Sequence, residues 1–308
     1  MGKIAFVFPG QGAQAVGMGQ DVYEHVLASR EVFDQANKQL DFQLTDLIFN
    51  GPDEMLKKTV NTQPALLTTS YALYKAFEEK GIRPDYVAGH SLGEYSALVV
   101  AGVLPFADAV ALVRKRGEFM EAAVPSGEGA MAAVLGAERE SLGNLCDDIT
   151  ATTAPVEMAN VNAPGQIVVS GTAAGVQAVI ERGKEAGAKR VIPLEVSGPF
   201  HSTLMKPAAE RLNVALSEVD FEDAVIPVVA NVSAKAEQSG ERIREMLVEQ
   251  VFSPVLWEDS VRYMIEQGVD TFIEIGSGTV LAGLIKKIDR SVKVVSINSL
   301  EAINAYEV

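Results

Sequence analysis

Ser91 is the residue whose setting in this sequence most strongly indicates chemistry. It is the middle residue of Gly89-His90-Ser91-Leu92-Gly93, a G-x-S-x-G pattern within VAGHSLGEYSALVVAG. Where such a pattern joins a strand to a helix, the turn is sharp and exposes the serine side chain. The following helix would direct its dipole and free N–H groups toward the hydroxyl. We interpret Ser91 as a nucleophile, with an ordinary strand-to-helix turn as the alternative.

A serine hydroxyl needs a general base near neutral pH, and the chain contains only three histidines. His25 lies among charged residues in DVYEHVLASREVF, a pattern typical of a surface helix. His90 adjoins Ser91, and consecutive side chains diverge in a tight turn, so His90 is poorly placed as the base. His201 lies in VSGPFHSTLM, a Gly-Pro loop of the kind that carries catalytic groups beside a sheet. His201 is therefore the predicted base, and a structural loop histidine is the alternative.

The group that would orient this imidazole is less evident. No Asp or Glu within 92–200 has an obvious loop setting at a strand end, but a main-chain carbonyl can accept Nδ1–H instead. The first predicted strand ends in PGQGAQAVGMG, whose glycine spacing misses G-x-G-x-x-G and which no Walker lysine follows. We interpret this loop as a source of oxyanion-binding N–H groups rather than a dinucleotide site. IEIGSGTVLAGL is interpreted as a structural strand-to-helix turn.

Arg116 is a cation on the apolar side of a predicted helix, FADAVALVRKRGEFM. At about 100° per residue, it falls within the arc that holds the apolar residues of this helix, while Arg114, Lys115 and Glu118 fall on the opposite side. An arginine directed into a core is costly unless an anion pairs with it. The anion is either a buried carboxylate of the chain or the carboxylate of a substrate, held by both arms of the guanidinium.

The elements that must position these residues form two patterns. Short apolar strands alternate with helices up to about residue 125 and again after His201, which predicts one α/β core with a mostly parallel sheet. Between them, residues 126–200 have the order βαββαβ, the ferredoxin-like split motif. We therefore expect a hydrolase-like core made of 1–125 and 201–308, with a small ferredoxin-like domain inserted at 126–200.

The composition excludes several classes of function. The formal net charge of -15 argues against general nucleic-acid binding, which needs a basic surface. No run approaches the roughly 20 apolar residues needed to span a membrane. The apolar run in MGKIAFVFPGQG is too short for a signal peptide. A single cysteine, Cys146, cannot form an internal disulfide, so we expect a cytoplasmic protein.

Taken together, the motifs resemble the malonyl-CoA:acyl carrier protein transacylases of fatty acid synthesis across essentially the whole chain. They occur in the order FPGQGAQ, TQPAL, GHSLGEYSAL, RGEFM, GAMAAVLG, NAPGQIVVSG, PFHSTLM, QVFSPVLWEDSV and EIGSGTVLAGL. The resemblance implies that Ser91 attacks the malonyl thioester and that His201 acts as base and then as acid. It also implies that the main-chain carbonyl of Gln250 orients His201, and that the N–H groups of Gln11 and Leu92 form the oxyanion hole.

The same resemblance implies the substrates and partners. Arg116 would grip the malonyl carboxylate, and Phe200 would leave little room for a methylmalonyl unit. The remaining cleft residues implied are Asn160, Gln63 and Met120. Malonyl-CoA and an acidic acyl carrier protein would be the substrates, with Lys189 and Arg190 near the carrier docking position. No bound cofactor or metal, nucleic acid or membrane is implied.

Three other functions compete with this interpretation. A serine esterase or thioesterase could use the same turn, although one that acts on neutral acyl chains has no use for Arg116. A non-catalytic carrier-binding module would not depend on Ser91. An acyltransferase of the same fold could also serve polyketide assembly rather than fatty acid synthesis.

Overall fold

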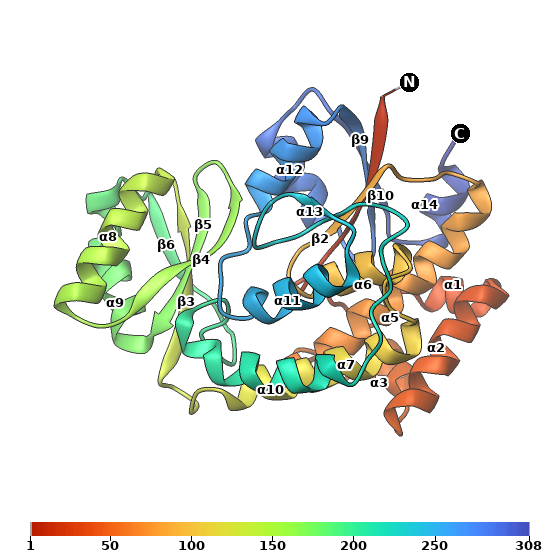
Figure 1. The fold of residues 1–308 in the computed structure, drawn as a ribbon, viewed down its shortest axis with the longest axis horizontal. Helices are drawn as coiled ribbons and strands as arrows, with labels where there is room; N and C mark the ends of the chain where they lie inside the picture. Colours follow the sequence, from red (N-terminus) through yellow and green to blue (C-terminus); the bar gives the residue numbers. More distant parts are fainter. Residues whose placement is uncertain (1, 308) are drawn as a thin grey trace.

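A computed structural model describes residues 2–307 of the chain, which form two lobes built on separate sheets (Figure 1). The larger sheet has six strands in the order β10-β9-β1-β2-β7-β8, and all neighbouring strands are parallel except β7 and β8. Its strands are β1 (Lys3–Phe8), β2 (Tyr86–Gly89), β7 (Val228–Val229), β8 (Ala236–Glu237), β9 (Val269–Ile275) and β10 (Lys293–Ile297). The mostly parallel sheet is as predicted. The apolar stretch IPVVAN also predicts a strand, but only its two residues Val228–Val229 form one, β7.

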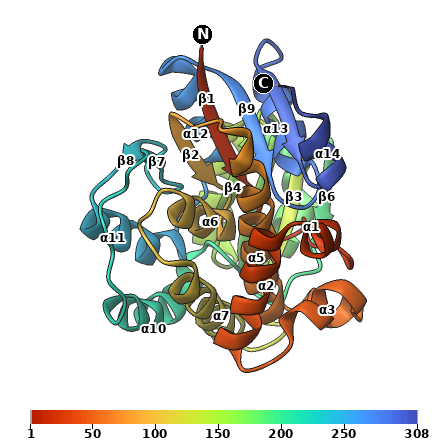
Figure 2. The ribbon, with the colours of Figure 1, turned by 90° about the vertical axis from the view of Figure 1, so that its right-hand side faces the viewer.

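Both faces of this sheet are covered, because successive side chains of a strand point to opposite faces. Phe6 and Phe8 of β1 belong to one apolar cluster, whereas Ala5 and Val7 belong to another. On the first face α2, α5 and α7 lie side by side (Figure 2). The helices before the insert are α1 (Gln20–His25), α2 (Leu27–Leu40), α3 (Leu44–Asn50), α4 (Asp53–Leu56), α5 (Thr59–Phe77), α6 (Leu92–Val100) and α7 (Phe106–Ala122).

The remaining helices of this lobe follow the small sheet in the chain. They are α10 (Lys206–Ser217), α11 (Gly240–Gln250), α12 (Trp257–Glu266), α13 (Val280–Ile288) and α14 (Leu300–Ala305). Trp257 of α12 and Leu281 of α13 pack in the cluster that covers the second face. The sequence after His201 predicts helices at 203–217, 240–250, 257–267 and 279–288, and all four are present within a few residues of these limits.

The stretch NTQPALLTTSYALYKAFEEKG predicts a helix that begins near Pro64, because proline is common in the first turn of a helix. This start is wrong, since α5 begins at Thr59 and contains Pro64. A proline inside a helix has no N–H to donate to the carbonyl four residues earlier, here that of Val60. Arg114 Nη1 donates to this Val60 carbonyl oxygen instead, at 3.1 Å. The side chain of a neighbouring helix thus replaces the missing main-chain donor.

The second lobe has the predicted order βαββαβ in its chain. It comprises β3 (Gly129–Leu135), α8 (Arg139–Thr152), β4 (Val156–Ala163), β5 (Gln166–Thr172), α9 (Ala173–Arg182) and β6 (Arg190–Pro193). The four strands form an antiparallel sheet in the order β4-β5-β3-β6. A separate apolar cluster joins this sheet to α8 and α9, so each lobe has its own core.

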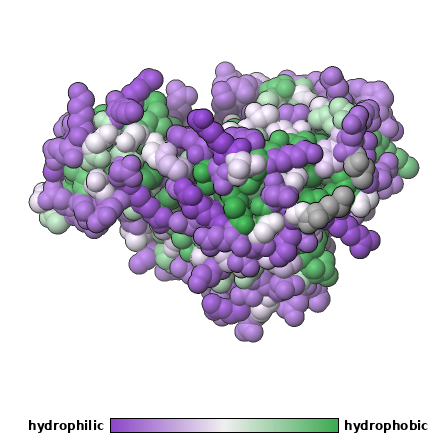
Figure 3. Space-filling view, turned by 90° about the horizontal axis from the view of Figure 1, so that it is seen from above, coloured by the Kyte–Doolittle hydropathy of each residue, from purple (hydrophilic) through white to green (hydrophobic). Residues whose placement is uncertain are grey.

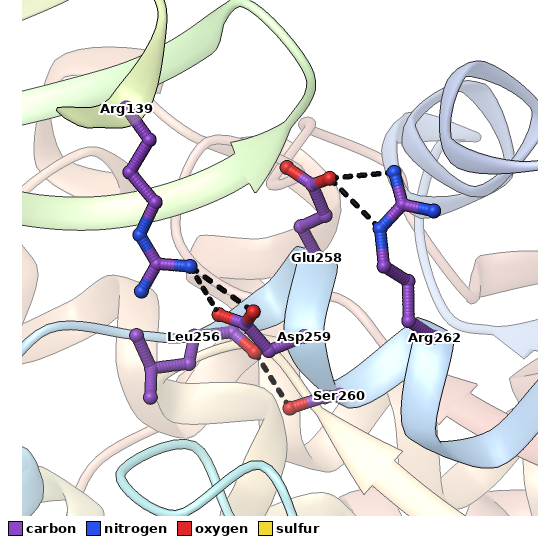
Figure 4. A network of polar contacts seen from close by, with 6 residues as sticks. All are labelled: Arg139, Leu256, Glu258, Asp259, Ser260 and Arg262. Carbon is purple, nitrogen blue, oxygen red and sulfur yellow. Dashed lines mark hydrogen bonds and ion pairs between the residues drawn. The ribbon is translucent and has the colours of Figure 1, made fainter. Parts of the chain in front are cut away.

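The strand β4 connects the two lobes. Val161 N donates to the Val255 carbonyl and Val255 N donates to the Ala159 carbonyl, both at 2.9 Å. Arg139 at the start of α8 adds an ion pair to Asp259 of α12 at 2.8 Å (Figure 4). Because both of these side chains are well exposed, the backbone bonds hold the lobes together more than this pair does. Seen from above, the outline of the molecule is indented between the lobes (Figure 3).

Within residues 2–307, no helix is both long and apolar enough to cross a membrane.

Candidate active site

Ser91 stands at a sharp turn between β2 and α6, as the G-x-S-x-G pattern predicts. Its φ of 52° and ψ of -108° are unfavourable for a residue with a side chain, and such strain is concentrated at functional sites. The flanking glycines allow the turn, because a Cβ on Gly93 would lie 2.1 Å from the carbonyl oxygen of Phe8. The Ser91 N–H donates to Asn231 Oδ1 at 2.8 Å, and this hydrogen bond fixes the backbone of the turn.

His201 is positioned to accept the Ser91 proton. Its Nε2 lies 2.8 Å from Ser91 Oγ, and its Nδ1 lies 2.8 Å from the main-chain oxygen of Gln250. A carbonyl oxygen only accepts, so Nδ1 carries the hydrogen and Nε2 accepts from the serine hydroxyl. Burial lowers the pKa of His201 to about 3, with a further contribution from the Arg116 cation. The imidazole is therefore neutral near pH 7, the state in which a general base must be.

Arg116 lies on the buried side of α7, as its place on the helix predicts, and only 1% of it is exposed. Its Nη1 donates to Gln63 Oε1 at 2.8 Å, and its Nη2 donates to Gln250 Oε1 at 2.8 Å and to Ser91 Oγ at 3.1 Å. Among residues 2–307 no carboxylate forms an ion pair with it. Burial lowers its pKa. The chain thus supplies a desolvated cation beside Ser91 with no carboxylate in direct contact with it.

Two backbone N–H groups of residues that line the cavity around Ser91 lack an acceptor among the described residues. Those of Gln11 and Leu92 have no hydrogen-bond acceptor within the part of the chain that the structure describes. Both residues line the same cavity as Ser91. Donors that are already in place stabilise the charge of a tetrahedral intermediate without reorganising.

The cavity has a volume of about 290 Å³ and lies where the two lobes meet. Most of the residues predicted for the site line it: Ser91, His201, Gln11, Leu92, Arg116, Asn160, Met120 and Phe200. Gln63 and Gln250 do not line the cavity but stand behind Arg116. Lys189 and Arg190 are exposed at β6, outside the cavity. Within residues 2–307, no group of three or more His, Cys, Asp or Glu side chains could hold a metal ion.

Several cleft residues were missed from the sequence. The segment IEIGSGTVLAGL forms the expected turn between β9 and α13, but Val280, Leu281 and Leu284 of α13 also line the cavity. Apolar residues at the start of a helix carry no chemical signal, so only their placement identifies them. The cavity is also lined by Asn162, whose Oδ1 lies 2.7 Å from His90 Nε2. His90 is thus turned away from Ser91 Oγ, as expected, and burial lowers its pKa.

Comparisons with known proteins identify the family of the chain. The model of the acyl transferase domain matches residues 5–302. The chain is 56% identical over 303 residues to the malonyl CoA-acyl carrier protein transacylase of Bacillus subtilis, covering 98% of this chain and 96% of that protein. It is 49% identical over 306 residues to the Staphylococcus aureus protein of the same name, covering 99% of each.

Solved structures give the same result. An acyl carrier protein S-malonyltransferase from Vibrio cholerae superposes with a TM-score of 0.96 at 44% identity, covering 99% of this chain and 100% of that one. A malonyl-transacylase solved with its type II PKS acyl carrier protein gives 0.95 at 44% identity, covering 98% of each chain.

These matches extend over nearly the whole chain and show that its class is that of the acyl transferases. At this identity and coverage, the chain belongs to the acyl transferase family, within its malonyl CoA-acyl carrier protein transacylases.

Proposed function

We propose that this chain transfers the malonyl group from malonyl-CoA to the phosphopantetheine thiol of an acyl carrier protein, through a malonyl ester of Ser91. The observation that carries the proposal is the Arg116 guanidinium, which is buried, without a carboxylate partner among the described residues, and 3.1 Å from Ser91 Oγ. A malonyl thioester has its free carboxylate one methylene from the carbonyl that a serine attacks. One substrate can therefore occupy both Arg116 and Ser91.

In the first half-reaction, the malonyl carboxylate binds Arg116 and His201 Nε2 takes the proton of Ser91 as Oγ bonds to the thioester carbon. The N–H groups of Gln11 and Leu92 bind the oxyanion, and each such donor contributes about 3–4 kcal/mol to the transition state. The C–S bond then breaks, and His201 returns its proton to the departing CoA thiolate. The product is malonyl-Ser91, and no cofactor takes part.

In the second half-reaction, the carrier's pantetheine thiol enters the same cavity. His201 takes the thiol proton, the sulfur attacks the ester carbonyl, and the Ser91 oxygen recovers the proton as the C–O bond breaks. Because the Gln250 carbonyl accepts from Nδ1–H throughout, the imidazole presents the same nitrogen in both halves. Acid–base help of this kind is worth about 10²–10⁴ in rate.

A serine thioesterase is the alternative that shares this machinery. It would release malonate to water, and one that acts on neutral acyl chains would leave Arg116 buried and unmatched. Charged groups are rarely retained in that state, because an unpaired buried cation is destabilising. The transferase is therefore the better supported function.

Intact-mass measurement after mixing the protein with malonyl-CoA, without a carrier, tests the proposal. We expect one malonyl group per chain, its loss on adding a phosphopantetheinylated carrier, and no labelling of Ser91→Ala. Ser96→Ala is the matched control, since Ser96 is a buried serine of α6, the helix that follows Ser91, and its hydroxyl has no partner among residues 2–307. Release of free malonate without labelling would favour the thioesterase. An unaltered protein that binds the carrier but neither takes up nor transfers malonyl would favour a non-catalytic module, and normal transfer by Ser91→Ala would exclude Ser91 as the nucleophile.

For the carrier, we propose docking beside Lys189 and Arg190. Both side chains are exposed, and neither forms an ion pair within the described part of the chain. On a protein of net charge -15, a local pair of cations is what an acidic partner requires to approach. Whether that carrier serves fatty acid or polyketide synthesis is answered by assaying both types of carrier.

For the architecture, we propose a hydrolase-like core of residues 1–125 and 201–308 with a small ferredoxin-like domain at 126–200. Residues 1 and 308 at the ends of these ranges lie outside the described residues. The sharp turn at Ser91 after a central parallel strand and the separate apolar cluster around β3–β6 support this division. The free, buried Cys146 supports a cytoplasmic setting.

A further inference from the structure

Glu94 is a buried carboxylate in the first turn of α6 that the two half-reactions do not use. Only 2% of it is exposed, and no Lys or Arg forms an ion pair with it within residues 2–307. Its Oε2 accepts from Gln250 Nε2 at 2.8 Å and from the main-chain N–H of Asn231 at 3.1 Å. Burial raises its pKa to about 7. Burying a carboxylate without a cation partner costs free energy, so we expect Glu94 to have a role that an apolar side chain could not fill.

The side-chain amide of Gln250 lies between Glu94 and Arg116. Its Oε1 accepts from Arg116 Nη2 at 2.8 Å, while its Nε2 faces Glu94 and also donates to the Ser91 carbonyl at 3.1 Å. A guanidinium only donates, and Glu94 Oε2 acts as an acceptor, since it receives hydrogen bonds from Gln250 Nε2 and Asn231 N. Only one orientation of the amide satisfies both. The reverse orientation would set an NH₂ group against the guanidinium and a carbonyl against the carboxylate.

The remaining contacts of Glu94 lead to the nucleophile. Asn231, whose N–H it accepts, uses its Oδ1 to accept from the Ser91 N–H at 2.8 Å and its Nδ2 to donate to the Gly89 carbonyl at 2.7 Å. Gln250 also supplies the carbonyl that orients His201. Glu94 thus accepts hydrogen bonds from both Asn231 and Gln250. Asn231 holds the turn at Ser91, and Gln250 holds His201 and Arg116.

We propose that Glu94 is a positioning residue: its carboxylate sets the orientation of the Gln250 amide, whose carbonyl then holds Arg116 ready for the carboxylate of the substrate. The inference rests on the proposed malonyl transfer. It assigns Glu94 no contact with the substrate. Its effect is transmitted through Gln250, and it is therefore larger for a malonyl than for an acetyl donor.

Two substitutions separate the hydrogen bond from the charge. Glu94→Gln keeps an acceptor oxygen at the same reach but removes the charge. Glu94→Asp keeps the charge but withdraws the carboxylate by one C–C bond, about 1.5 Å, which takes it out of reach of Gln250 Nε2. Glu210→Gln, on the exposed side of α10, is the control.

The measurement is kcat/KM for malonyl-CoA and for acetyl-CoA on the same preparation of each variant. Their ratio does not depend on the fraction of the preparation that is folded. We expect Glu94→Asp to lower the malonyl-to-acetyl ratio about tenfold, mainly through a higher KM for malonyl-CoA, since a bond to a charged group is lost. We expect Glu94→Gln to keep the ratio within about threefold of the unaltered enzyme.

Two results would overturn the inference. The first is an unchanged malonyl-to-acetyl ratio in Glu94→Asp, which includes equal losses for both donors. The second is a ratio in Glu94→Gln as low as in Glu94→Asp. Should Glu94→Asp be insoluble, Glu94→Ala removes the same bond and is expected to lower the ratio equally. An unaltered enzyme with no preference for malonyl-CoA would instead refute the proposed function, so the two failures are distinguishable.

Discussion

Replacing Arg116 by alanine is the most direct test of how this site selects its acyl group. In the free enzyme the guanidinium is 1% exposed and is held by Gln63, Gln250 and Ser91 Oγ. Truncating one partner of a buried, hydrogen-bonded charge pair costs about 2–5 kcal/mol. A bound malonyl carboxylate replaces part of these existing contacts, so we expect Arg116→Ala to lose about 3 kcal/mol of transition-state binding, within this range. This free energy corresponds to a loss of about 10²-fold in kcat/KM for malonyl-CoA.

Acetyl-CoA should respond differently because it has a methyl group where malonyl-CoA has a carboxylate. Arg116→Ala removes a cation that the methyl group cannot pair with, so kcat/KM for acetyl-CoA should fall by no more than about threefold. Arg116→Lys keeps the charge but not the two-armed geometry of the guanidinium. Its malonyl-to-acetyl ratio of kcat/KM should lie between those of the unaltered enzyme and Arg116→Ala.

The assay follows thiol release from each donor with a saturating carrier, together with the melting temperature of each variant. The expected result is a malonyl-to-acetyl ratio at least about 30-fold lower in Arg116→Ala. If both donors lose the same factor, Arg116 does not bind the substrate carboxylate, and the selection of a malonyl group must have another cause.

Four further predictions follow from the structure. Because the neutral imidazole is the active base, kcat/KM is lost as pH falls through the pKa of His201. Removing the Arg116 cation raises that pKa, so the acid limb of the pH profile for acetyl-CoA should move to higher pH in Arg116→Ala. An acid limb that does not move would contradict the electrostatic coupling of these two residues. His201→Ala should lower kcat about 10²–10⁴-fold, and near-normal kcat would exclude it as the base. Replacing Lys189 and Arg190 together by glutamate should raise KM for the carrier and leave acylation by malonyl-CoA unaltered, whereas equal effects on both half-reactions would argue against docking there. Gly93→Ala should lower the free energy of unfolding by about 2 kcal/mol or more, since its Cβ would lie 2.1 Å from a main-chain oxygen of β1, and an unshifted urea midpoint would refute that clash.

The three side chains proposed to carry the chemistry could be predicted from the sequence. Ser91 was identified from its flanking glycines, His201 by elimination among three histidines, and Arg116 from the period of a helix. Each of these signals is local, because a tight turn and a helical face depend on residues close together in the chain. The roles of Gln250, Gln11 and Leu92 were inferred from the family resemblance, since a backbone group has no sequence signal of its own.

Glu94 illustrates what was missed. A carboxylate among small and apolar residues, three positions after the nucleophile, is an anomaly that the sequence displays openly. Its partners, however, are separated from it by 137 and 156 positions in the chain, so nothing local predicts them.

By itself, the sequence determined the alternating strands and helices, the sharp turn at Ser91 and the burial of Arg116, since these follow from residue type and short-range periodicity. Only the tertiary structure decided that the Gln250 amide stands between a cation and a carboxylate and that α13 forms a wall of the cavity. The physical reason is that such contacts depend on how separate elements pack, and side chains that meet in space carry no mark of their partners along the chain.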